Sequence, residues 1–303
     1  MAESDSLYSK IVREMFAPAW TRTSGKQTIS FLAKKLGVDE ETVRNTLAKM
    51  HKSGFLKSWS LTPNPHLFGM EWETLSVNAA SSSRERAVTQ LRLVDGIVAI
   101  YTFLNDPMLR IVLCYVDSED LERKIRLISS ISGSTRPQAS WKVLFPPHNI
   151  KLKRTDWLII RLLLRNSKRN VSEIAKETGI STRTVTRRLS VMIERRSFFL
   201  RPIVDVKRLD GFLYQFVISF HDAAKKSIAD GIMRGSVRNI IYADTYPEGY
   251  SIIAAICQNL SEAEQVTAWL RSMDGVKEVT PTVVEDIIFV QDWISHEIEK
   301  RLR

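Results

Sequence analysis

In the middle of the chain the hydrophobic positions recur with the period of an α-helix. Thr155 can cap a first helix that carries Trp157 and Ile160 on one face, and a short second helix ends at Gly179, where a residue without Cβ suits a tight turn. Ser181 is a residue type that begins helices, and it precedes a third helix with a single apolar stripe. An apolar, strand-like run follows. Helix, tight turn, capped helix and strand together predict a winged helix-turn-helix.

After such a segment in each half of the chain, the hydrophobic period changes to that of β-strands. In the first half the pattern predicts strand 70–79, helix 83–93, strands 96–103 and 110–116, helix 118–131 and strand 140–145. In the second half it predicts strand 212–220, helix 222–234, strands 237–245 and 250–257, helix 261–273, strand 276–289 with a break near Pro281, and a final helix over 292–302. The order β-α-β-β-α-β is that of a ferredoxin-like sandwich.

The two halves share an ungapped register. Residues 29–38 align with residues 171–180, 142 positions later, and a serine, an alanine, a lysine and a glycine recur at matching places. A repeat of this kind predicts a tandem duplication. The expected α+β fold therefore alternates two winged helix-turn-helix domains with two ferredoxin-like domains, over 1–67, 68–149, 150–208 and 209–303, the last with a C-terminal helix. The uncovered faces of the two sheets can pair within one chain, as an intramolecular pseudo-dimer.

The positive charge of the chain is concentrated in one segment. The 303 residues carry a net charge of +10 in an ordinary globular composition, with 44% hydrophobic and 26% charged residues. Residues 150–208 hold 16 Lys+Arg and 5 Asp+Glu, whereas residues 209–303 hold 9 and 14. The second helix-turn-helix thus carries the whole net excess. Such a segment favours a polyanionic partner, and release of phosphate counterions would make its affinity salt-sensitive.

The outward face of the third helix in this segment suits the major groove of double-stranded DNA, because arginine pairs with guanine edges and threonine with phosphates. The residues predicted to contact DNA there are Thr182, Arg183, Thr186, Arg187, Arg188 and Ser190, with Lys168, Arg169 and Arg201 on the flanking phosphates. In the first copy Arg44 and Asn45 can contact bases, but Glu40 and Glu41 would face the phosphates. We therefore expect the second motif to be the main DNA reader, and the first to bind more weakly or to serve as scaffold.

Together these parts resemble the leucine-responsive/asparagine-type (Lrp/AsnC) family of bacterial and archaeal regulators. The resemblance covers nearly the whole chain twice and is carried by Lys153–Ile160, Val171–Leu189, Met273–Val279 and Leu93–Val98. It implies winged helix-turn-helix domains, ferredoxin-like domains that sense a small molecule, usually an amino acid, and dimers joined through the sensing domains. The turns at 105–108 and 246–250 do not match the family's effector turn, so the effector's identity stays open.

The sequence contains none of the motifs that mark a nucleophile, a phosphate loop, a dinucleotide site or a metal-binding helix. The five histidines are scattered, and Cys114 and Cys257 lie in apolar runs typical of buried thiols. We therefore expect a sequence-specific DNA-binding transcriptional regulator that is not an enzyme and has no catalytic residue, cofactor or metal.

Two alternatives remain beside the regulator. Siroheme decarboxylases of the haem pathway share this architecture, but they need basic or histidine side chains to hold tetrapyrrole carboxylates and to protonate carbon. Residues 99–104 and 240–245, in the predicted second strands, contain no His and no Arg. A protein-interaction scaffold is the other alternative, and the acidic residues of the first motif fit it.

The location of the protein is also a prediction. No apolar run approaches the ~18–20 residues of a membrane span. The N-terminal residues Met-Ala-Glu-Ser-Asp-Ser are acidic and lack an apolar signal core. Both observations predict a cytoplasmic protein, and the resemblance implies a bacterial or archaeal source. The sequence leaves four questions open: the operator sequence, whether the protein activates or represses, whether the first motif contacts DNA, and whether the chain forms homodimers.

Overall fold

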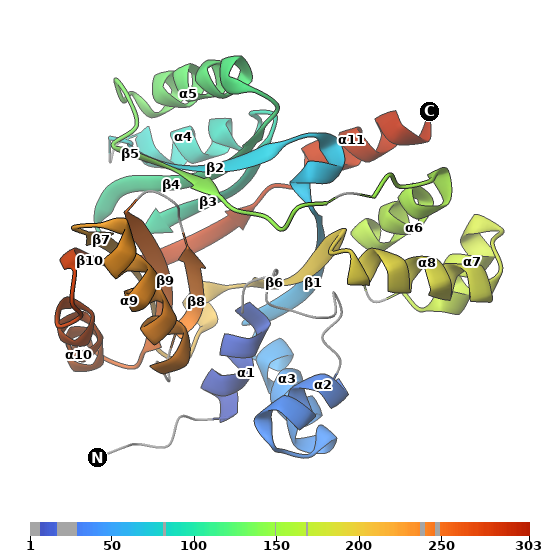
Figure 1. Cartoon of the computed structure of the whole chain (residues 1–303), viewed down its shortest axis with the longest axis horizontal. Coiled ribbons are helices and arrows are strands. Elements are labelled where there is room, and N and C mark those ends of the chain that lie inside the picture. The colour runs from blue at the N-terminus through green and yellow to red at the C-terminus, as the bar shows by residue number, and fades with distance from the viewer. Residues whose placement is uncertain are drawn as a thin grey trace.

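The computed structural model describes residues 7–16, 29–80, 83–148, 150–167, 169–236, 240–245 and 249–303. It contains two helix-turn-helix units connected by a ribbon of two strands, and a large sheet that carries helices on its outer faces (Figure 1). The predicted α+β class, with winged helix-turn-helix units and ferredoxin-type sheets, is confirmed. The order of elements in the first half recurs in the second. The domain boundaries and an origin by tandem duplication stay predictions from the sequence.

The first helix-turn-helix unit consists of α1 (Leu7–Phe16), α2 (Ile29–Leu36) and α3 (Glu40–Lys52), and strand β1 (Leu56–Pro63) follows it. Asp39 begins α3, because its side chain accepts a hydrogen bond of 2.7 Å from the backbone N–H of Thr42. Val43 and Met50 face inward from α3 and are fully buried against Ile11 of α1. Their burial fixes α3 against α1 and β1, and leaves its opposite face to solvent.

The second unit consists of α6 (Arg154–Arg165), α7 (Val171–Thr178), α8 (Thr182–Glu194) and strand β6 (Phe198–Val204). Ser181 caps α8 and Gly179 adopts a φ of 69°, as predicted. The predicted cap at Thr155 is wrong. Lys153 precedes α6, and the Oδ2 atom of Asp156 accepts a hydrogen bond of 2.8 Å from the Lys153 backbone N–H. A carboxylate in the first turn therefore stabilises this helix end.

Each ferredoxin-like unit has four strands and two helices. The first contains β2 (Glu71–Asn78), α4 (Arg84–Leu91), β3 (Ile97–Phe103), β4 (Asp106–Tyr115), α5 (Ser118–Ser132) and β5 (Ala139–Val143). The second contains β7 (Phe212–Phe220), α9 (Ala223–Ser236), β8 (Ile240–Thr245), β9 (Tyr250–Cys257), α10 (Leu260–Arg271) and β10 (Val276–Phe289). Leu91 and Ile128 pack from the helices onto the outer face of the first sheet, and Leu270 does so on the second. The two helices of each unit thus cover one sheet face and leave the other for a different partner.

Strand β10 joins the two units into one sheet with the strand order β5-β2-β4-β3-β10-β7-β9-β8. Its first part pairs with β7 and its last part with β3, both antiparallel. The predicted break near Pro281 is wrong, because Pro281 stays in the ladder opposite Phe216. A strand tolerates proline where the ladder does not need its missing N–H. The register instead shifts between Val276 and Glu278.

The inner faces of the two half-sheets contact one another. The rings of Trp141 in β5 and Tyr250 in β9 have centroids 5.9 Å apart, and Arg110 of β4 donates a hydrogen bond to the side-chain oxygen of Gln215 in β7. Val112 and Val217 belong to the same apolar cluster as these contacts. The faces left uncovered by the helices therefore pack together within a single chain.

The strands that follow the two helix-turn-helix units pair antiparallel as a ribbon, with Leu61 opposite Leu200. Helix α11 (Asp292–Leu302) leaves the end of β10 and packs on α6, with Trp293 and Ile298 buried in the core of the second unit. The second helix-turn-helix unit is thereby connected to the rest of the molecule at two places, through β6 in the ribbon and through α11 at the end of β10. No helix within the described ranges is long and apolar enough to cross a membrane.

Candidate functional site

A groove of about 1000 Å³ lies between the ribbon, the end of β10 and the turn that follows α6. Trp59 of β1 and Phe289 of β10 give it an aromatic wall. The turn contributes Asn166 and Ser167, and Ser167 donates a hydrogen bond of 2.8 Å from its hydroxyl to the backbone oxygen of Trp59. The groove thus forms where three distant parts of the sequence meet, and it has room for a large, flat ligand.

Three exposed cationic side chains stand around this groove, on three different elements. Lys57 comes from β1, Arg92 ends α4, and Arg165 ends α6. Lys57 is 3.2 Å from a carboxylate oxygen of Asp205, whereas no ion pair joins Arg92 or Arg165 to another described residue. Asp286 and Asp292 also reach the lining. The rim is therefore mixed in sign, with positive side chains from three separate elements.

Arg201 of β6 stands behind the wall of the groove. It lies opposite Ser60 in the ribbon and two residues from Ile203 on the same strand, and its guanidinium carbon is 4.0 Å from the ring centroid of Phe289. Those three neighbours all line the groove. The Nε and Nη2 atoms of Arg201 are buried, and no described residue offers either a hydrogen-bond partner. Burial lowers the pKa of Arg201 to about 10, so the side chain stays positively charged at neutral pH.

Tyr101 connects this arginine with a second, buried arginine in the sheet. Tyr101 of β3 is beside Arg110 of β4 in the sheet ladder, and its phenol acts electrostatically against the effect of burial on the pKa of Arg201. Arg110 is only 2% exposed, and its guanidinium carbon lies 5.1 Å from the ring centroid of Phe103. Tyr101 is thus the ladder neighbour of the buried Arg110 and interacts electrostatically with Arg201. Burying a cation is costly unless an anion or hydrogen-bond acceptors compensate it.

The sequence-based search for basic residues in the sheet missed this cluster. It covered residues 99–104 and 240–245, but Arg110 lies one strand further along, and Arg201 lies in the ribbon. An arginine between Leu109 and Ile111, in a strand expected to be buried, was a signal available in the sequence, because arginine is almost never fully buried without a partner. The sequence contains no comparable signal for the groove, because the segments that form its walls come together only in the folded chain.

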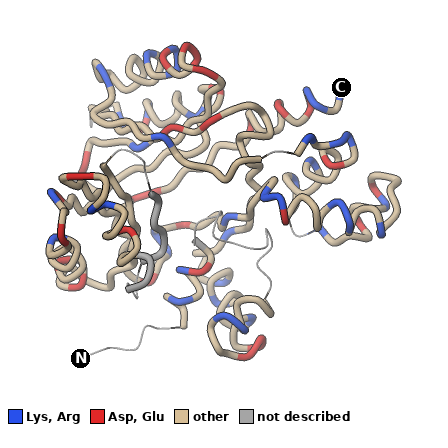
Figure 2. The backbone as a smooth tube through the Cα atoms, viewed as in Figure 1, with Lys and Arg blue, Asp and Glu red and all other residues tan. Residues whose placement is uncertain are grey.

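Five of the residues predicted to contact DNA on α8 are exposed, namely Thr182, Arg183, Thr186, Arg187 and Ser190. Figure 2 shows positive residues along this second helix-turn-helix unit. Arg44 and Asn45 are likewise exposed on α3, and Glu40 and Glu41 are exposed at its start. The solvent-facing orientation that the helical period predicts is therefore present in both units, and contact with DNA stays a prediction.

The other members of the predicted DNA surface have different surroundings. Arg188 turns inward and pairs with the fully buried Asp156, 2.5 Å from Nε to Oδ1, so it stabilises the unit and does not face a ligand. Arg169 pairs with Glu177 of α7. Arg201 faces the sheet interior, because the ribbon packs against β10 on that side. Lys168 lies outside the described residues.

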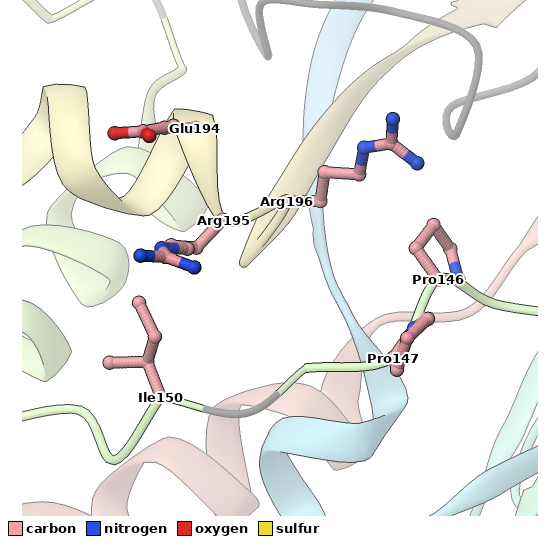
Figure 3. A pocket seen from close by; sticks show the side chains of 6 residues that line it. All are labelled: Pro146, Pro147, Ile150, Glu194, Arg195 and Arg196. Carbon is pink, nitrogen blue, oxygen red and sulfur yellow. The ribbon is translucent and has the colours of Figure 1, made fainter.

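A second pocket, of about 410 Å³, lies between α8 and the connection to the second unit. Arg195 and Ile150 point towards each other across it, whereas Arg196 points away over Pro146 (Figure 3). Beside it, Nε2 of His148 is 2.8 Å from the hydroxyl of Ser197. Burial, and secondarily the neighbouring His66, lower the pKa of His148, so this contact involves a neutral imidazole at neutral pH.

The prediction of two buried thiols is confirmed, whereas the absence of a metal stays a prediction. The described part of the chain contains no group of three His, Cys, Asp or Glu side chains placed to hold a metal ion. Cys114 and Cys257 are free and buried, as predicted, and burial raises the pKa of each thiol to about 12. Neither cysteine is therefore a thiolate nucleophile at neutral pH.

Comparison with known proteins gives matches to part of the chain and matches to nearly its whole length. Residues 152–195 match the family model described as winged helix-turn-helix DNA-binding. The chain is similar over 98% of its length to the crystal structure of the siroheme decarboxylase NirDL, of which 99% is covered, with 13% identity and a TM-score of 0.57. The structure of NirDL in complex with an iron-uroporphyrin III analogue gives a TM-score of 0.58 at the same identity and coverage. AsnC of E. coli matches 45% of this chain and 93% of its own length, with 19% identity and a TM-score of 0.35. No curated protein matches the chain.

The full-length likeness corrects two expectations. The sequence led us to expect a transcriptional regulator that is not an enzyme, but the fold that extends over the whole chain is one that an enzyme, a siroheme decarboxylase, also has. The helix-turn-helix pattern and its charge describe one segment, and the family match is confined to that segment. The helix-turn-helix motif of this segment therefore does not by itself decide the function of the whole chain.

Proposed function

We propose that this protein is an enzyme that binds an iron tetrapyrrole with several carboxylate side chains in the groove and removes carbon dioxide from a carboxylate side chain. The observation that carries the proposal is the buried, positively charged Arg201 behind the groove wall, whose Nε and Nη2 have no acceptor among the described residues. It occurs in a chain with the fold of a siroheme decarboxylase throughout. A buried cation of this kind calls for an anion from outside the chain.

The groove offers what such a ligand requires. Its volume of about 1000 Å³ is at the upper end of the range of small-molecule sites. Trp59 and Phe289 can stack on the flat macrocycle, because aromatic faces pack favourably on one another. Lys57, Arg92 and Arg165 can pair with carboxylates that point to the solvent. Aromatic surface and separated cations match a flat polycarboxylate better than a small amino acid.

The reaction needs one bond broken and one proton supplied. The bond between the carboxylate carbon and the side chain breaks, carbon dioxide leaves, and the electron pair stays on the side-chain carbon, which then takes a proton. We assign that proton to the Tyr101 phenol, which lies beside Arg201 and Arg110. A positioned side chain that transfers a proton contributes about 10²–10⁴-fold to rate. A proton from water then restores the phenol.

The proposal is tested by adding iron uroporphyrin and siroheme separately to the purified protein. We expect a saturable change in the visible absorption spectrum with both, and with siroheme the release of carbon dioxide and a product that has lost carboxyl groups, measured by mass spectrometry. Binding without any loss of carbon dioxide would identify a tetrapyrrole-binding protein and not an enzyme. Absence of spectral change with both ligands would remove the basis of the proposal.

For residues 152–195 we propose contact with double-stranded DNA, as a property separate from the reaction. The family match and the exposed Arg183 and Arg187 on α8 support it. We expect an electrophoretic mobility shift that weakens as salt rises, because phosphate contacts release counterions. The double substitution of Arg183 and Arg187 by alanine should weaken the shift. A shift that the double variant leaves unchanged would show that α8 does not make the contact.

A further inference from the structure

The groove presents positive charge in two different environments. Arg92 and Arg165 are exposed at the rim, whereas Nε and Nη2 of Arg201 are buried behind the wall. Dissolved salt screens exposed charges strongly and buried ones much less. A ligand with several carboxylates therefore meets two kinds of contact, one that salt weakens and one that it does not.

The buried edge of Arg201 has the shape of a carboxylate site. The hydrogens of Nε and Nη2 lie in the guanidinium plane and point outward from one edge, where they match the two oxygens of one carboxylate. The chain itself contains an example, since Arg188 holds Asp156 through the same two atoms. In Arg201 the ring of Phe289 occupies the face of the guanidinium, while this edge has no acceptor among the described residues.

We infer that Arg201 is the residue that selects and orients the substrate, by holding one of its carboxylates in a bidentate pair inside the protein, while Arg92 and Arg165 hold other carboxylates at the surface. The inference rests on the proposed function and adds the orientation of the ligand. It places the anchored carboxylate near Tyr101, whose phenol interacts electrostatically with that guanidinium. A side chain of the macrocycle must then pass between Ser60 and Phe289 to reach the arginine.

The test compares Arg201→Met with Arg165→Met, because both changes remove a positive charge and keep an unbranched side chain. Iron uroporphyrin is titrated into each full-length variant at low and at high salt, and Kd is read from the absorption change. We expect Arg201→Met to weaken binding about 30-fold or more at both salt concentrations, as truncating one member of a buried charge pair does. Arg165→Met should weaken binding mainly at low salt, and Arg201→Lys should recover part of the lost affinity.

Stability in the absence of ligand gives an independent measurement. A buried cation without a hydrogen-bond partner is unfavourable, so Arg201→Met should leave the urea midpoint of unfolding unchanged or raise it. Equal affinity of Arg201→Met and the unchanged protein would overturn the inference and leave the proposed function standing. A large loss of stability in Arg201→Met would also overturn it, because it would show that the stack on Phe289 is structural. Failure of the unchanged protein to bind iron uroporphyrin would overturn the inference and the proposed function together.

Discussion

Replacing Asp156 with alanine is expected to lower the free energy of unfolding by about 3–5 kcal/mol, the usual effect of breaking a buried ion pair. Asp156 is fully buried, accepts a bidentate pair from Arg188 and also caps α6 through the backbone N–H of Lys153. Its removal leaves a largely buried guanidinium without its carboxylate at the junction of α6 and α8. Urea unfolding followed by circular dichroism and tryptophan fluorescence measures the effect.

Arg187 supplies the matched control for this experiment. It is adjacent to Arg188 on α8 but is exposed, so Arg187→Ala should change the free energy of unfolding by no more than about 0.5 kcal/mol. The double variant Asp156→Ala with Arg188→Met should be more stable than Asp156→Ala alone, because no uncompensated buried charge remains. Equal effects of Asp156→Ala and Arg187→Ala would show that the pair contributes nothing to stability.

Replacing Tyr101 with phenylalanine is expected to reduce the rate of decarboxylation about 10²–10⁴-fold, the contribution of a positioned proton donor. The change removes one hydroxyl beside Arg201 and Arg110 and keeps the ring. Binding of iron uroporphyrin should stay within a few-fold of the unchanged protein, because Arg201 and the groove rim remain. Single-turnover formation of carbon dioxide, measured with siroheme, separates the chemical step from binding.

Tyr115→Phe is the control for Tyr101→Phe. Tyr115 lies on β4, as Arg110 does, but it packs with the outer-face cluster beneath α4 and α5. It should therefore leave the rate of decarboxylation unchanged. If Tyr101→Phe keeps full turnover, the proton comes from another group or from water, and the assignment to the phenol is wrong. A parallel loss of rate in both variants would indicate a general disturbance of the sheet.

The helix-turn-helix units could be predicted because their signals are local. Ser181 and Gly179 act on backbone groups within three or four residues, and the apolar stripe of α8 repeats with the helical period. The strands of both ferredoxin-like units were found for the same reason, from their period of two. The continuity of β10 through Pro281 was not predicted, because the tolerance of a strand for proline depends on which N–H groups the neighbouring strands need.

The candidate site could not be assembled from the sequence in the same way. Arg201 was predicted to hold a phosphate, since a basic residue near a basic helix is usually solvent-exposed. Its neighbours in the structure, Phe289 and Tyr101, lie far away in the sequence. The residue pattern of the ribbon strands does not show which face of the ribbon packs on the sheet. The inward turn of Arg188 was not predicted for a related reason, because its partner Asp156 lies 32 positions earlier in the chain.

By itself the sequence determined the α+β class, the helix-turn-helix pattern, the positive charge of residues 150–208 and the exposed face of α8, because each depends on residues close together along the chain. Only the tertiary structure decided which arginines are buried, since burial depends on contacts between segments that lie far apart in the sequence. The same packing encloses Arg201 between the ribbon and β10 and forms the groove in front of it. The charge of a residue is a local property, but its role depends on whether water or protein surrounds it.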